Sequence, residues 1–519
     1  MAPKFGCDLE HEVTLVKKFQ LSDLLVDLPE TRLIGPDVEI QGLACDSRRI
    51  KGGELFFALP GTNCDGRDFI PAALAAGATA LVLPQASAGE YPVPVVVGAN
   101  VRLLMAKIAQ RFYGDPGAGA LVIGITGTNG KTTISYLLEA IFKQAGYRPA
   151  VFGTINYRYA ERQLLAAHTT PESLDLVRMM AEFRAAGANV LILEVSSHAL
   201  AQYRVAGVHF NIAVFTNLTP EHLDYHQDME SYFASKSRLF AQQPPPAMVV
   251  NLDDAYGVRL KKLYPQALGY ARSASAELGY EELSAGLDGQ RGTIRTPRGQ
   301  LSLTSPLVGD FNASNLLAAV GVACVAKIDL SLSAQALAQA PQVPGRLERV
   351  ENSPGVLALV DYAHTSDALT QVLQALAAIP AKRRVTLVGC GGDRDPRKRP
   401  LMAAAAVTAS DLTILTSDNP RSEDPQAILN QMRQGALDAG ACELSPSQLN
   451  DSVTGFALVL ERRAAIELAV GCVGKGDILL VAGKGHEDYQ ILGQERIHFD
   501  DREELRRAFG LLAVEGSVR

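Results

Sequence analysis

The sequence predicts an α/β protein with three domains. Its 519 residues are too many for one hydrophobic core. Short apolar runs typical of buried strands alternate along the chain with segments whose apolar residues recur every three or four positions, as in helices. Breaks in this pattern near residue 118 and at Pro344–Arg346 divide the chain into 1–117, 118–345 and 346–519. We expect a small α/β domain, a central domain with a mostly parallel sheet, and a C-terminal Rossmann-like doubly wound domain.

Composition limits the classes of function. Hydrophobic residues make up 47% and charged residues 20% of the chain, as in ordinary globular proteins. A net charge of −7 without a long basic run argues against a nucleic-acid partner. The apolar run Leu316–Ala326 ends at Lys327 and is too short to cross a membrane, and the charged N-terminus lacks the apolar core of a secretory signal. With seven scattered cysteines and no CxxC pair, we expect a cytoplasmic protein with reduced thiols.

In the first domain, two predicted strands each lead into a polar, glycine-containing loop. The strand 38–43 is followed by Cys45–Arg48, and the strand 54–59 is followed by Pro60–Arg67. Open α/β sheets bind ligands at strand ends, so these loops are candidates for a polar substrate, although most such loops are only turns. The other expected elements are helices at 21–28 and 72–77 and strands at 80–84 and 93–97.

The central domain opens with a strand, a phosphate loop and a helix. The apolar run Leu121–Ile125 precedes a loop rich in glycine and threonine, and helical periodicity begins at Lys131 and stops at Gly146. Backbone N–H groups at a helix N-terminus suit a phosphate chain, the lysine adds a positive charge, and the next hydroxyl can join a Mg²⁺ shell. The motif departs from a strict Walker A because its first glycine is Gly127. A tight turn without a ligand is the alternative, which the Gly-Lys-Thr sequence disfavours. The candidate phosphate-binding residues are Gly127, Thr128, Asn129, Gly130, Lys131, Thr132 and Thr133.

Three further side chains of this domain are candidates. Glu194 ends the predicted strand 190–193, where a carboxylate can hold Mg²⁺ beside phosphates; a solvated strand-end glutamate is the alternative. His222 and His226 are spaced for a zinc pair, but no HExxH pattern and no third ligand accompany them. By composition, Lys236 is an ordinary solvated lysine. The remaining elements expected here are strands at 150–155 and 213–216 and helices at 171–187, 231–241 and 316–326.

In the third domain, four predicted strands end in polar clusters. The strands are 356–360, 385–388, 412–415 and 478–482, and the clusters are Asp361–His364, Gly391–Arg394, Asp418–Arg421 and Gly483–Glu487. Carboxyl ends of parallel strands share one sheet edge, so a composite site is expected rather than four unrelated turns. Arg394 and Arg421 suit carboxylates and Glu487 suits an ammonium group, a combination that would recognise a free amino acid; interstrand ion pairing is the alternative. A GxGxxG fingerprint is not completed, because Arg394 stands at its last position, so no NAD site is expected.

Several motifs resemble those of the Mur ligases, the ATP-dependent amide-forming enzymes of peptidoglycan assembly. TGTNGKTT, EVSSHAL, NLTPEHLDYH, the lysine of YFASKSRLF and GDFNASN resemble the central domain of that family, where the displaced glycine is typical. The resemblance implies a P-loop-type ATPase domain that binds ATP and two Mg²⁺ ions. Thr132 and Glu194 would hold the first ion, and His222 with a carbamylated Lys236 would hold the second. Nucleotide contacts would come from Asn312, Asn315 and Arg346.

The motifs of the outer domains narrow the resemblance. DYAHTSDAL, GCGGDRD, DNPRSEDP and AGKGHEDYQ resemble Mur ligases that add meso-2,6-diaminopimelate, whereas lysine-adding relatives lack the arginine of DNPR. The additional carboxylate of diaminopimelate can pair with Arg421. The implied diaminopimelate contacts are Arg394, Asp418, Asn419, Pro420, Arg421, Gly483 and Glu487. DSR and GTNCDGR match a uridine-binding pattern, and the implied contacts with the UDP-linked substrate are Cys45, Ser47, Thr62, Asn63, Cys64, His168, Thr169, Thr170, Ser196, Gln202 and Arg204.

The resemblance implies an ATP-dependent ligase that works through an acyl phosphate. It would phosphorylate the D-glutamate γ-carboxylate of UDP-N-acetylmuramoyl-L-alanyl-D-glutamate. The incoming amine then needs a base, for which His364 or a carboxylate near it is the candidate. We expect a monomer with small-molecule substrates whose domains close on binding. A folylpolyglutamate synthase is one alternative, which should lack DNPR and the uridine-type first domain. A non-catalytic nucleotide-binding protein is another, which predicts the loss of Glu194, His222 or Lys236; all three are present.

Overall fold

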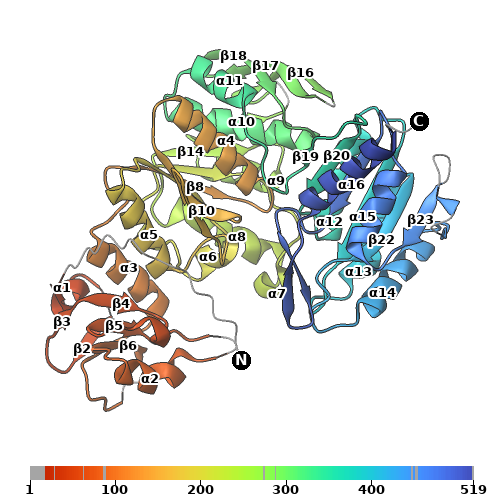
Figure 1. The fold of residues 1–519 in the computed structure, drawn as a ribbon. Helices are drawn as coiled ribbons and strands as arrows, with labels where there is room; N and C mark the ends of the chain where they lie inside the picture. The colour runs from red at the N-terminus through yellow and green to blue at the C-terminus, as the bar shows by residue number, and fades with distance from the viewer. Residues whose placement is uncertain are drawn as a thin grey trace. The chain divides into compact units, whose positions relative to one another are not determined.

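The computed structural model describes residues 18–28, 30–61, 64–85, 89–272, 275–286, 288–445, 448–449 and 454–516 (Figure 1). Of the predicted contacts with the UDP-linked substrate, Thr62 and Asn63 lie outside the described residues. The chain forms two compact units, Met1–Gly269 with Val325–Ile328 and Tyr270–Cys324 with Asp329–Arg519. The predicted domain boundaries at 117/118 and 345/346 stay predictions.

The first domain is built on a sheet of order β2-β7-β6-β5-β4, in which β4 to β7 are parallel and β2 is antiparallel. The predicted strand 38–43 is divided in two, because the backbone N–H of Gln41 turns to the carbonyl of Gly53 (2.8 Å). The strands are β1 (Phe19–Gln20), β2 (Arg32–Ile34), β3 (Glu39–Ile40), β4 (Gly42–Ala44), β5 (Glu54–Phe57), β6 (Ala80–Pro84) and β7 (Val95–Gly98). The helices are α1 (Leu21–Leu25), α2 (Ile70–Ala75) and α3 (Val101–Tyr113), of which α3 was not predicted.

The central sheet of the first unit has the order β11-β10-β9-β12-β8-β13-β14. From β9 to β14 its strands are parallel, and β8 lies between β12 and β13. The chain leaves β8 toward one side of the sheet and returns later on the other side, so the carboxyl end of β8 is a topological switch point, where open α/β sheets bind ligands. The phosphate loop follows β8 and occupies that position.

The strands of this sheet are β8 (Leu121–Thr126), β9 (Pro149–Phe152), β10 (Asn156–Tyr159), β11 (Arg162–Leu165), β12 (Val190–Glu194), β13 (Ile212–Phe215) and β14 (Ala247–Asn251). The helices are α4 (Lys131–Gln144), α5 (Ser173–Ala185), α6 (Ser197–Ala201), α7 (Leu223–His226), α8 (Met229–Ala241) and α9 (Ala255–Leu263). Apolar residues of α5 and α8 pack with those of the parallel strands in one buried core. Alternation of apolar strands and amphipathic helices thus produces the parallel sheet that the sequence predicts.

The second unit begins with a hairpin sheet and two helices. β15 (Leu268–Ala271), β16 (Leu278–Gly286), β17 (Gly289–Thr296) and β18 (Gly299–Ser305) form consecutive neighbours, antiparallel from β16 onward. The helices are α10 (Asp310–Val325) and α11 (Leu330–Ala338). The Tyr280 hydroxyl donates to the carbonyl of Ala313 (3.0 Å) and thereby ties β16 to α10.

The C-terminal part is a doubly wound sheet of order β19-β20-β24-β21-β22-β23, parallel except for β19 (Figure 1). Helices α12 to α14 contribute to the core on one face, and α15 and α16 contribute to the core on the other. The strands are β19 (Glu348–Val350), β20 (Leu357–Asp361), β21 (Arg384–Cys390), β22 (Leu412–Ser417), β23 (Gly455–Leu458) and β24 (Ile478–Ala482), with the hairpin β25 (Tyr489–Leu492) and β26 (Glu495–His498). The helices are α12 (Ser366–Ala377), α13 (Lys398–Ala409), α14 (Pro425–Asp438), α15 (Arg462–Gly471) and α16 (Asp501–Gly516).

The predicted α/β class and the doubly wound C-terminal sheet are confirmed. Within the described residues, no helix has the length and apolar character needed to cross a membrane. The six described cysteines form no disulfides, and they are Cys45, Cys64, Cys324, Cys390, Cys442 and Cys472.

Candidate active site

The phosphate loop has the backbone that its glycines predict. Gly127 (φ 148°) and Gly130 (φ 91°) both lie at positive φ, and α4 starts at Lys131 as expected. A Cβ atom at Gly127 would overlap the hydroxyl oxygen of Thr216. Only glycine can therefore join β8 to this loop without displacing β13.

Two lysine amines meet at one carbonyl oxygen of the loop. Lys131 Nζ donates to the carbonyls of Gly127 (2.8 Å) and Thr128 (2.7 Å). Lys236 Nζ, from α8, donates to the same Gly127 oxygen (2.8 Å). The charge of Lys131 at this loop provides the positive potential that an anionic phosphate chain requires.

The expectation from composition that Lys236 is solvated is wrong. Its residue is 2% exposed, and Nζ lies 4.6 Å from the centre of the Tyr232 ring. Burial, and then the charge of Lys131, hold the pKa of the Lys236 amine well below its usual value. Helical periodicity places Lys236 on the buried face of α8, and composition carries no such directional information.

Glu194 is also buried, so the solvated strand-end alternative does not hold. The residue is 1% exposed at the end of β12. Its Oε2 accepts hydrogen bonds from the hydroxyls of Thr132 (2.9 Å) and Thr154 (2.8 Å), and its Oε1 accepts one from Ser135 (3.2 Å). Three hydroxyl donors allow a carboxylate to stay charged out of water. Thr154 and Ser135 were missed by the sequence analysis, although a buried strand-end glutamate implies such donors.

His222 and His226 lie in different surroundings. His222 precedes α7 with a left-handed backbone (φ 57°), and its ring lies 4.8 Å from that of His198. His226 is buried, and its Nε2 lies 2.9 Å from the Ser197 hydroxyl. Among the described residues there is no group of three or more His, Cys, Asp or Glu side chains suited to a metal, so the structure gives a zinc pair no third ligand.

The predicted substrate residues of the central domain surround Glu194. The Thr170 hydroxyl donates to the Glu194 carbonyl (2.7 Å), and the Thr169 hydroxyl lies 3.1 Å from that of Thr154. Arg204 donates to the Thr170 carbonyl (2.9 Å) and to the Gln202 side chain (2.9 Å).

Ser196 and His168 belong to the same group. The backbone N–H of Ser196 donates to the Thr170 hydroxyl (3.1 Å), while its own hydroxyl caps α6. The carbonyl of His168 accepts from the Tyr157 hydroxyl (2.6 Å), and burial, with Arg204 nearby, lowers the pKa of the His168 ring.

Charged pairs connect this region to the first domain. Glu172 pairs with Arg204 (3.0 Å) and with Arg102 of α3 (2.9 Å), and Asp175 pairs with Arg49 (2.9 Å). Burial, with Asp175 and Glu172 next in effect, raises the pKa of the Cys45 thiol to about 12. Cys45 therefore lies beside the central-domain residues, and Ser47 opens the adjoining 3-10 helix η1 (Ser47–Arg49). Cys64 is exposed, and no contact ties it to this group among the described residues.

In the second unit, the four polar clusters follow β20, β24, β21 and β22, which are neighbours in the sheet, so their predicted placement along one sheet edge is confirmed; the composite site there stays a prediction. Asn419 Nδ2 donates to Glu487 Oε2 (2.9 Å) and joins two of the clusters. Arg421 has a left-handed backbone (φ 53°), and its side chain donates to the Gly392 carbonyl (2.8 Å). Its backbone N–H donates to the carbonyl of Ile491 (3.2 Å) in β25.

Other predicted amino-acid contacts are placed nearby. Asp418 is buried, Pro420 precedes Arg421, and Gly483 follows β24 at a positive φ of 114°. Arg394 is exposed and donates to the carbonyl of Asp393 (3.1 Å).

A buried arginine missed by the sequence analysis holds two of these loops together. Arg399, at the start of α13, makes a two-pronged pair with Glu423 (2.9 and 2.8 Å). The backbone N–H of Asp393 donates to Glu423 (2.5 Å), and the Ser422 hydroxyl donates to the Asp393 carboxylate (2.6 Å). A fixed relation between the loops restricts where the guanidinium group of Arg421 can lie.

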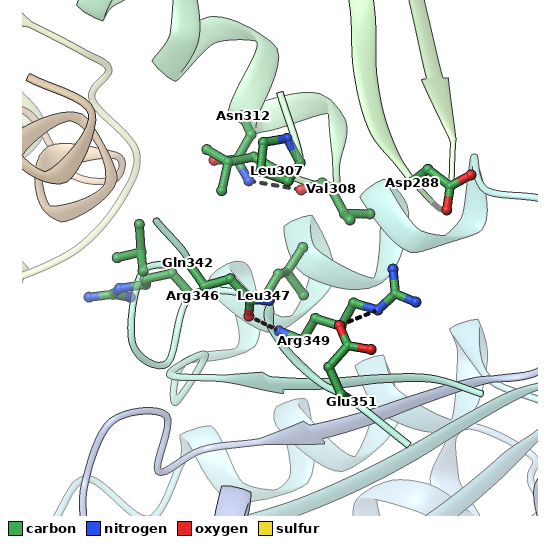
Figure 2. Close-up of a pocket in the computed structure, with 11 residues that line it drawn as sticks. Asp288, Leu307, Val308, Asn312, Gln342, Arg346, Leu347, Arg349 and Glu351 are labelled. Atoms are coloured by element: carbon green, nitrogen blue, oxygen red, sulfur yellow. Dashed lines mark hydrogen bonds and ion pairs between the residues drawn. The ribbon is translucent and has the colours of Figure 1, made fainter. Parts of the chain in front are cut away.

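The predicted nucleotide contacts of the second unit lie at a cavity of about 160 Å³ (Figure 2). Asn312 and Arg346 line it, and Asn312 Nδ2 donates to the Val308 carbonyl (2.8 Å). Asn315 donates to Asn312 Oδ1 (2.9 Å). The Arg346 guanidinium lies over the Tyr362 ring at 5.1 Å.

His364 lies in the loop that follows β20. Its Nδ1 is 2.9 Å from the carbonyl oxygen of Tyr362. A carbonyl only accepts hydrogen bonds, so Nδ1 carries the proton and the lone pair of the neutral ring is on Nε2. This tautomer suits a base.

Comparisons with known proteins agree with this arrangement. Family models match residues 39–113 (Mur ligase family, catalytic domain), 125–323 (Mur ligase middle domain) and 345–485 (Mur ligase, glutamate ligase domain). A relative from Geobacter metallireducens, UDP-N-acetylmuramoyl-L-alanyl-D-glutamate--2,6-diaminopimelate ligase, is 47% identical over 493 residues, which are 92% of this chain and 96% of the relative.

Solved structures show the same fold. One structure of a UDP-N-acetylmuramoyl-L-alanyl-D-glutamate--2,6-diaminopimelate ligase has a TM-score of 0.65 and 35% identity, covering 91% of this chain and 95% of that chain. A folylpolyglutamate synthase from Mycobacterium tuberculosis, complexed with ADP, has a TM-score of 0.58 and 18% identity, covering 73% of this chain and 92% of that chain. Because the relative from Geobacter metallireducens matches over almost its whole length and the three family models fall on the three predicted domains, the chain belongs to the Mur ligase family.

Proposed function

We propose that this chain joins meso-2,6-diaminopimelate to the D-glutamate γ-carboxylate of UDP-N-acetylmuramoyl-L-alanyl-D-glutamate, converting ATP to ADP and phosphate. The observation that carries the proposal is the sheet edge where Arg421 and the linked pair Asn419–Glu487 present a guanidinium and a carboxylate. These groups complement the carboxylate and ammonium ends of an amino acid. The relative with this ligase name, at 47% identity, supports the same conclusion. The product would be a peptidoglycan precursor.

ATP would bind at the phosphate loop. Lys131 would exchange its bonds with the Gly127 and Thr128 carbonyls for bonds with phosphate oxygens, at the N-terminus of α4. Asn312, Asn315 and Arg346 are proposed as nucleotide contacts from the second unit.

The residues present fit Mg²⁺. Thr132 and Glu194 place a hydroxyl and a carboxylate oxygen 2.9 Å apart beside the loop, and hard oxygen ligands are those that Mg²⁺ prefers. These two residues would hold one ion, and His222 with a carbamylated Lys236 would hold a second. When bound, the ions would offset negative charge as the phosphate and the carboxylate approach each other.

The crowding of two amines at Gly127 supports carbamylation of Lys236. Addition of CO₂ to the neutral buried amine, with release of one proton, would place a carbamate anion beside the positive Lys131. We expect a carbamate signal in ¹³C NMR spectra of the protein kept in ¹³C-bicarbonate, and no such signal in Lys236→Arg. The exposed lysine of α4 provides the control, because Lys143→Arg should keep the signal. An identical spectrum for the wild type and Lys236→Arg would remove the modification from the proposal.

The reaction would proceed in two steps. An oxygen of the γ-carboxylate attacks the γ-phosphorus of ATP, forming an acyl phosphate and releasing ADP. The amine of diaminopimelate then attacks the acyl carbon, and the tetrahedral intermediate expels inorganic phosphate as the amide forms. Lys131 would stabilise the developing charge on the phosphoryl oxygens, and His364 Nε2 is the proposed acceptor of the amine proton.

Two other functions receive less support. The likeness to folylpolyglutamate synthase, at 18% identity, is one of fold alone. A non-catalytic nucleotide-binding protein would not need Glu194 with three hydroxyl donors or a buried lysine beside the loop.

Phosphate release from ATP tests the proposal. With the UDP-linked dipeptide present, meso-diaminopimelate is expected to support turnover at least about tenfold better in kcat/KM than L-lysine, because lysine leaves Arg421 without its carboxylate. Equal turnover of the two amino acids would contradict the specificity, and turnover of neither would contradict the function.

A further inference from the structure

Lys484 is a fully buried cation between two carboxylates of the amino-acid site. It follows β24, and the residue is 0% exposed. Its Nζ lies 3.4 Å from Glu487 Oε2 and 3.8 Å from Asp418 Oδ1, and it also donates to the carbonyl of Tyr489. No substrate-binding role was predicted for Lys484 from the sequence.

The carboxylates are not fully satisfied by the protein. Asp418 is 7% exposed, and its Oδ1 accepts no hydrogen bond within the described part of the chain. Glu487 Oε2 accepts a hydrogen bond from Asn419 Nδ2 (2.9 Å) and a longer one from Lys484 Nζ (3.4 Å). Two carboxylates and one ammonium leave a net charge of −1 in a place largely removed from water. Such a site lacks one cation and one hydrogen-bond donor.

We propose that Lys484 is a positioning residue, which holds Asp418 and Glu487 together as two anions so that they accept one ammonium group of the incoming amino acid. The inference rests on the proposed function, since it assumes that this sheet edge binds an amino acid. Without Lys484, two neighbouring buried carboxylates would share a proton, and a protonated carboxyl binds an ammonium poorly.

The other charged and titratable groups around Glu487 do not replace Lys484. Burial and the charge of Asp418 raise the pKa of Glu487, and the charge of Lys484 opposes that rise. Arg462 of α15 is already engaged in a fully buried pair with Asp501 (2.6 Å). Tyr489 and Tyr362 also feel the charge of Glu487, but both stay neutral because burial raises the pKa of each phenol.

Kinetics of Lys484→Met test the proposal, with the exposed Lys475→Met as the matched control. We expect the KM for diaminopimelate to rise about tenfold or more, while the KM values for ATP and the UDP-linked dipeptide stay unchanged. Loss of the cation raises the pKa of Glu487, so the acid limb of kcat/KM for diaminopimelate should move to higher pH. An unchanged KM and pH profile, or an equal rise in all three KM values, would overturn the proposal.

Two further variants separate the proposed role from a general loss of stability. Lys484→Arg keeps the charge and should keep the acid limb of the wild type even if its KM for diaminopimelate rises; a shifted limb would count against the proposal. In a Glu487→Gln background, Lys484→Met should add little further loss, because it acts through Glu487. If the losses caused by the two substitutions were fully additive, Lys484 would not act through Glu487, which would contradict the proposal. If the wild type itself shows no diaminopimelate-dependent phosphate release, the proposed function has failed instead.

Discussion

Single charged residues that the fold removes from water define both candidate sites. The Glu194 carboxyl group accepts hydrogen bonds from three hydroxyls, and Lys236 shares a carbonyl oxygen with Lys131. Burying a charge costs several kcal/mol of desolvation free energy unless partners offset it. Removing one partner of a buried pair destabilises a protein by roughly 3–5 kcal/mol. The chain keeps these two groups at the loop where phosphate is proposed to bind.

Arg421 should determine the choice of amino acid. Arg421→Ala removes the guanidinium group that would pair with the additional carboxylate of diaminopimelate, so kcat/KM for diaminopimelate should fall about 100-fold, as for a buried charge pair. ATP binding, measured by calorimetry, should be unchanged, because the phosphate loop lies on β8 and α4 of the first unit. Arg433→Ala, which removes an exposed arginine of α14, is the control. Wild-type kinetics in Arg421→Ala would exclude the assigned role.

His486 should make the protein less stable in mild acid. Burial, with Arg346 and Arg502 next, lowers the pKa of its ring from 6.5 to about 4. The unfolded chain takes up the proton at the higher pH, so this contribution to stability is lost as the pH falls from about 6.5 towards about 4. The free energy of unfolding, measured with urea, should fall less across that pH range in His486→Gln than in the wild type.

His498 should have the opposite pH dependence, because its pKa is shifted in the opposite direction from that of His486. The hydrogen bond and charge of Glu503 raise the pKa of His498, so its contribution is present below its usual pKa and is lost as the pH rises. If the free energy of unfolding had the same pH dependence in His486→Gln and in the wild type, His486 would not be the group that causes the loss of stability in acid.

At the scale of elements, the ends of apolar strands were predictable and the contacts between loops were not. The strands that lead to Glu194 and Asp361 are continuously apolar up to these carboxylates, which marks buried parallel strands. The pair Arg399–Glu423 joins residues 24 positions apart in sequence, and no local pattern encodes it. The hairpin β25–β26 was also missed, because its second strand is exposed throughout and lacks alternating burial.

The turn between β8 and α4 should tolerate no side chain at Gly127. Gly127→Ala adds a Cβ that overlaps Thr216 and adopts an unfavourable positive φ, which alone costs roughly 1–2 kcal/mol. We expect ATP affinity to fall about tenfold or more, and the melting temperature to fall by roughly a few degrees, as a cost of this size implies. Gly471→Ala at the end of α15, where a Cβ would meet no atom within 4 Å, is the control. Equal ATP affinity in the two variants would refute the steric argument.

For the whole molecule, sequence periodicity was enough to predict the α/β class and the doubly wound C-terminal sheet. Periodicity reports which face of an element is buried, and that decides the layers. It does not report side-chain partners, which is why the hydroxyls around Glu194 and the bond from Lys236 to the Gly127 carbonyl became visible only in three dimensions.

The proposed reaction would use groups from both compact units, because the phosphate loop belongs to the first and the proposed amino-acid site to the second. We expect substrate binding to change the distance between a fluorescent label at exposed Glu161 and one at exposed Lys475, each introduced through a cysteine. Energy transfer should change when a non-hydrolysable ATP analogue, the dipeptide substrate and diaminopimelate are all present. No change, in a labelled enzyme that stays active, would contradict the predicted closure.

The carbonyl oxygen of Gly127, which accepts both lysine amines, sets a condition that an inhibitor of this loop has to meet. A compound must offer Lys131 an acceptor at least as strong as the two carbonyl oxygens it would give up. Phosphonates, sulfonates and carboxylates form stronger, charge-assisted hydrogen bonds with an ammonium group than neutral acceptors do. Libraries rich in anionic fragments are therefore the better starting point for antibacterial chemistry directed at this loop.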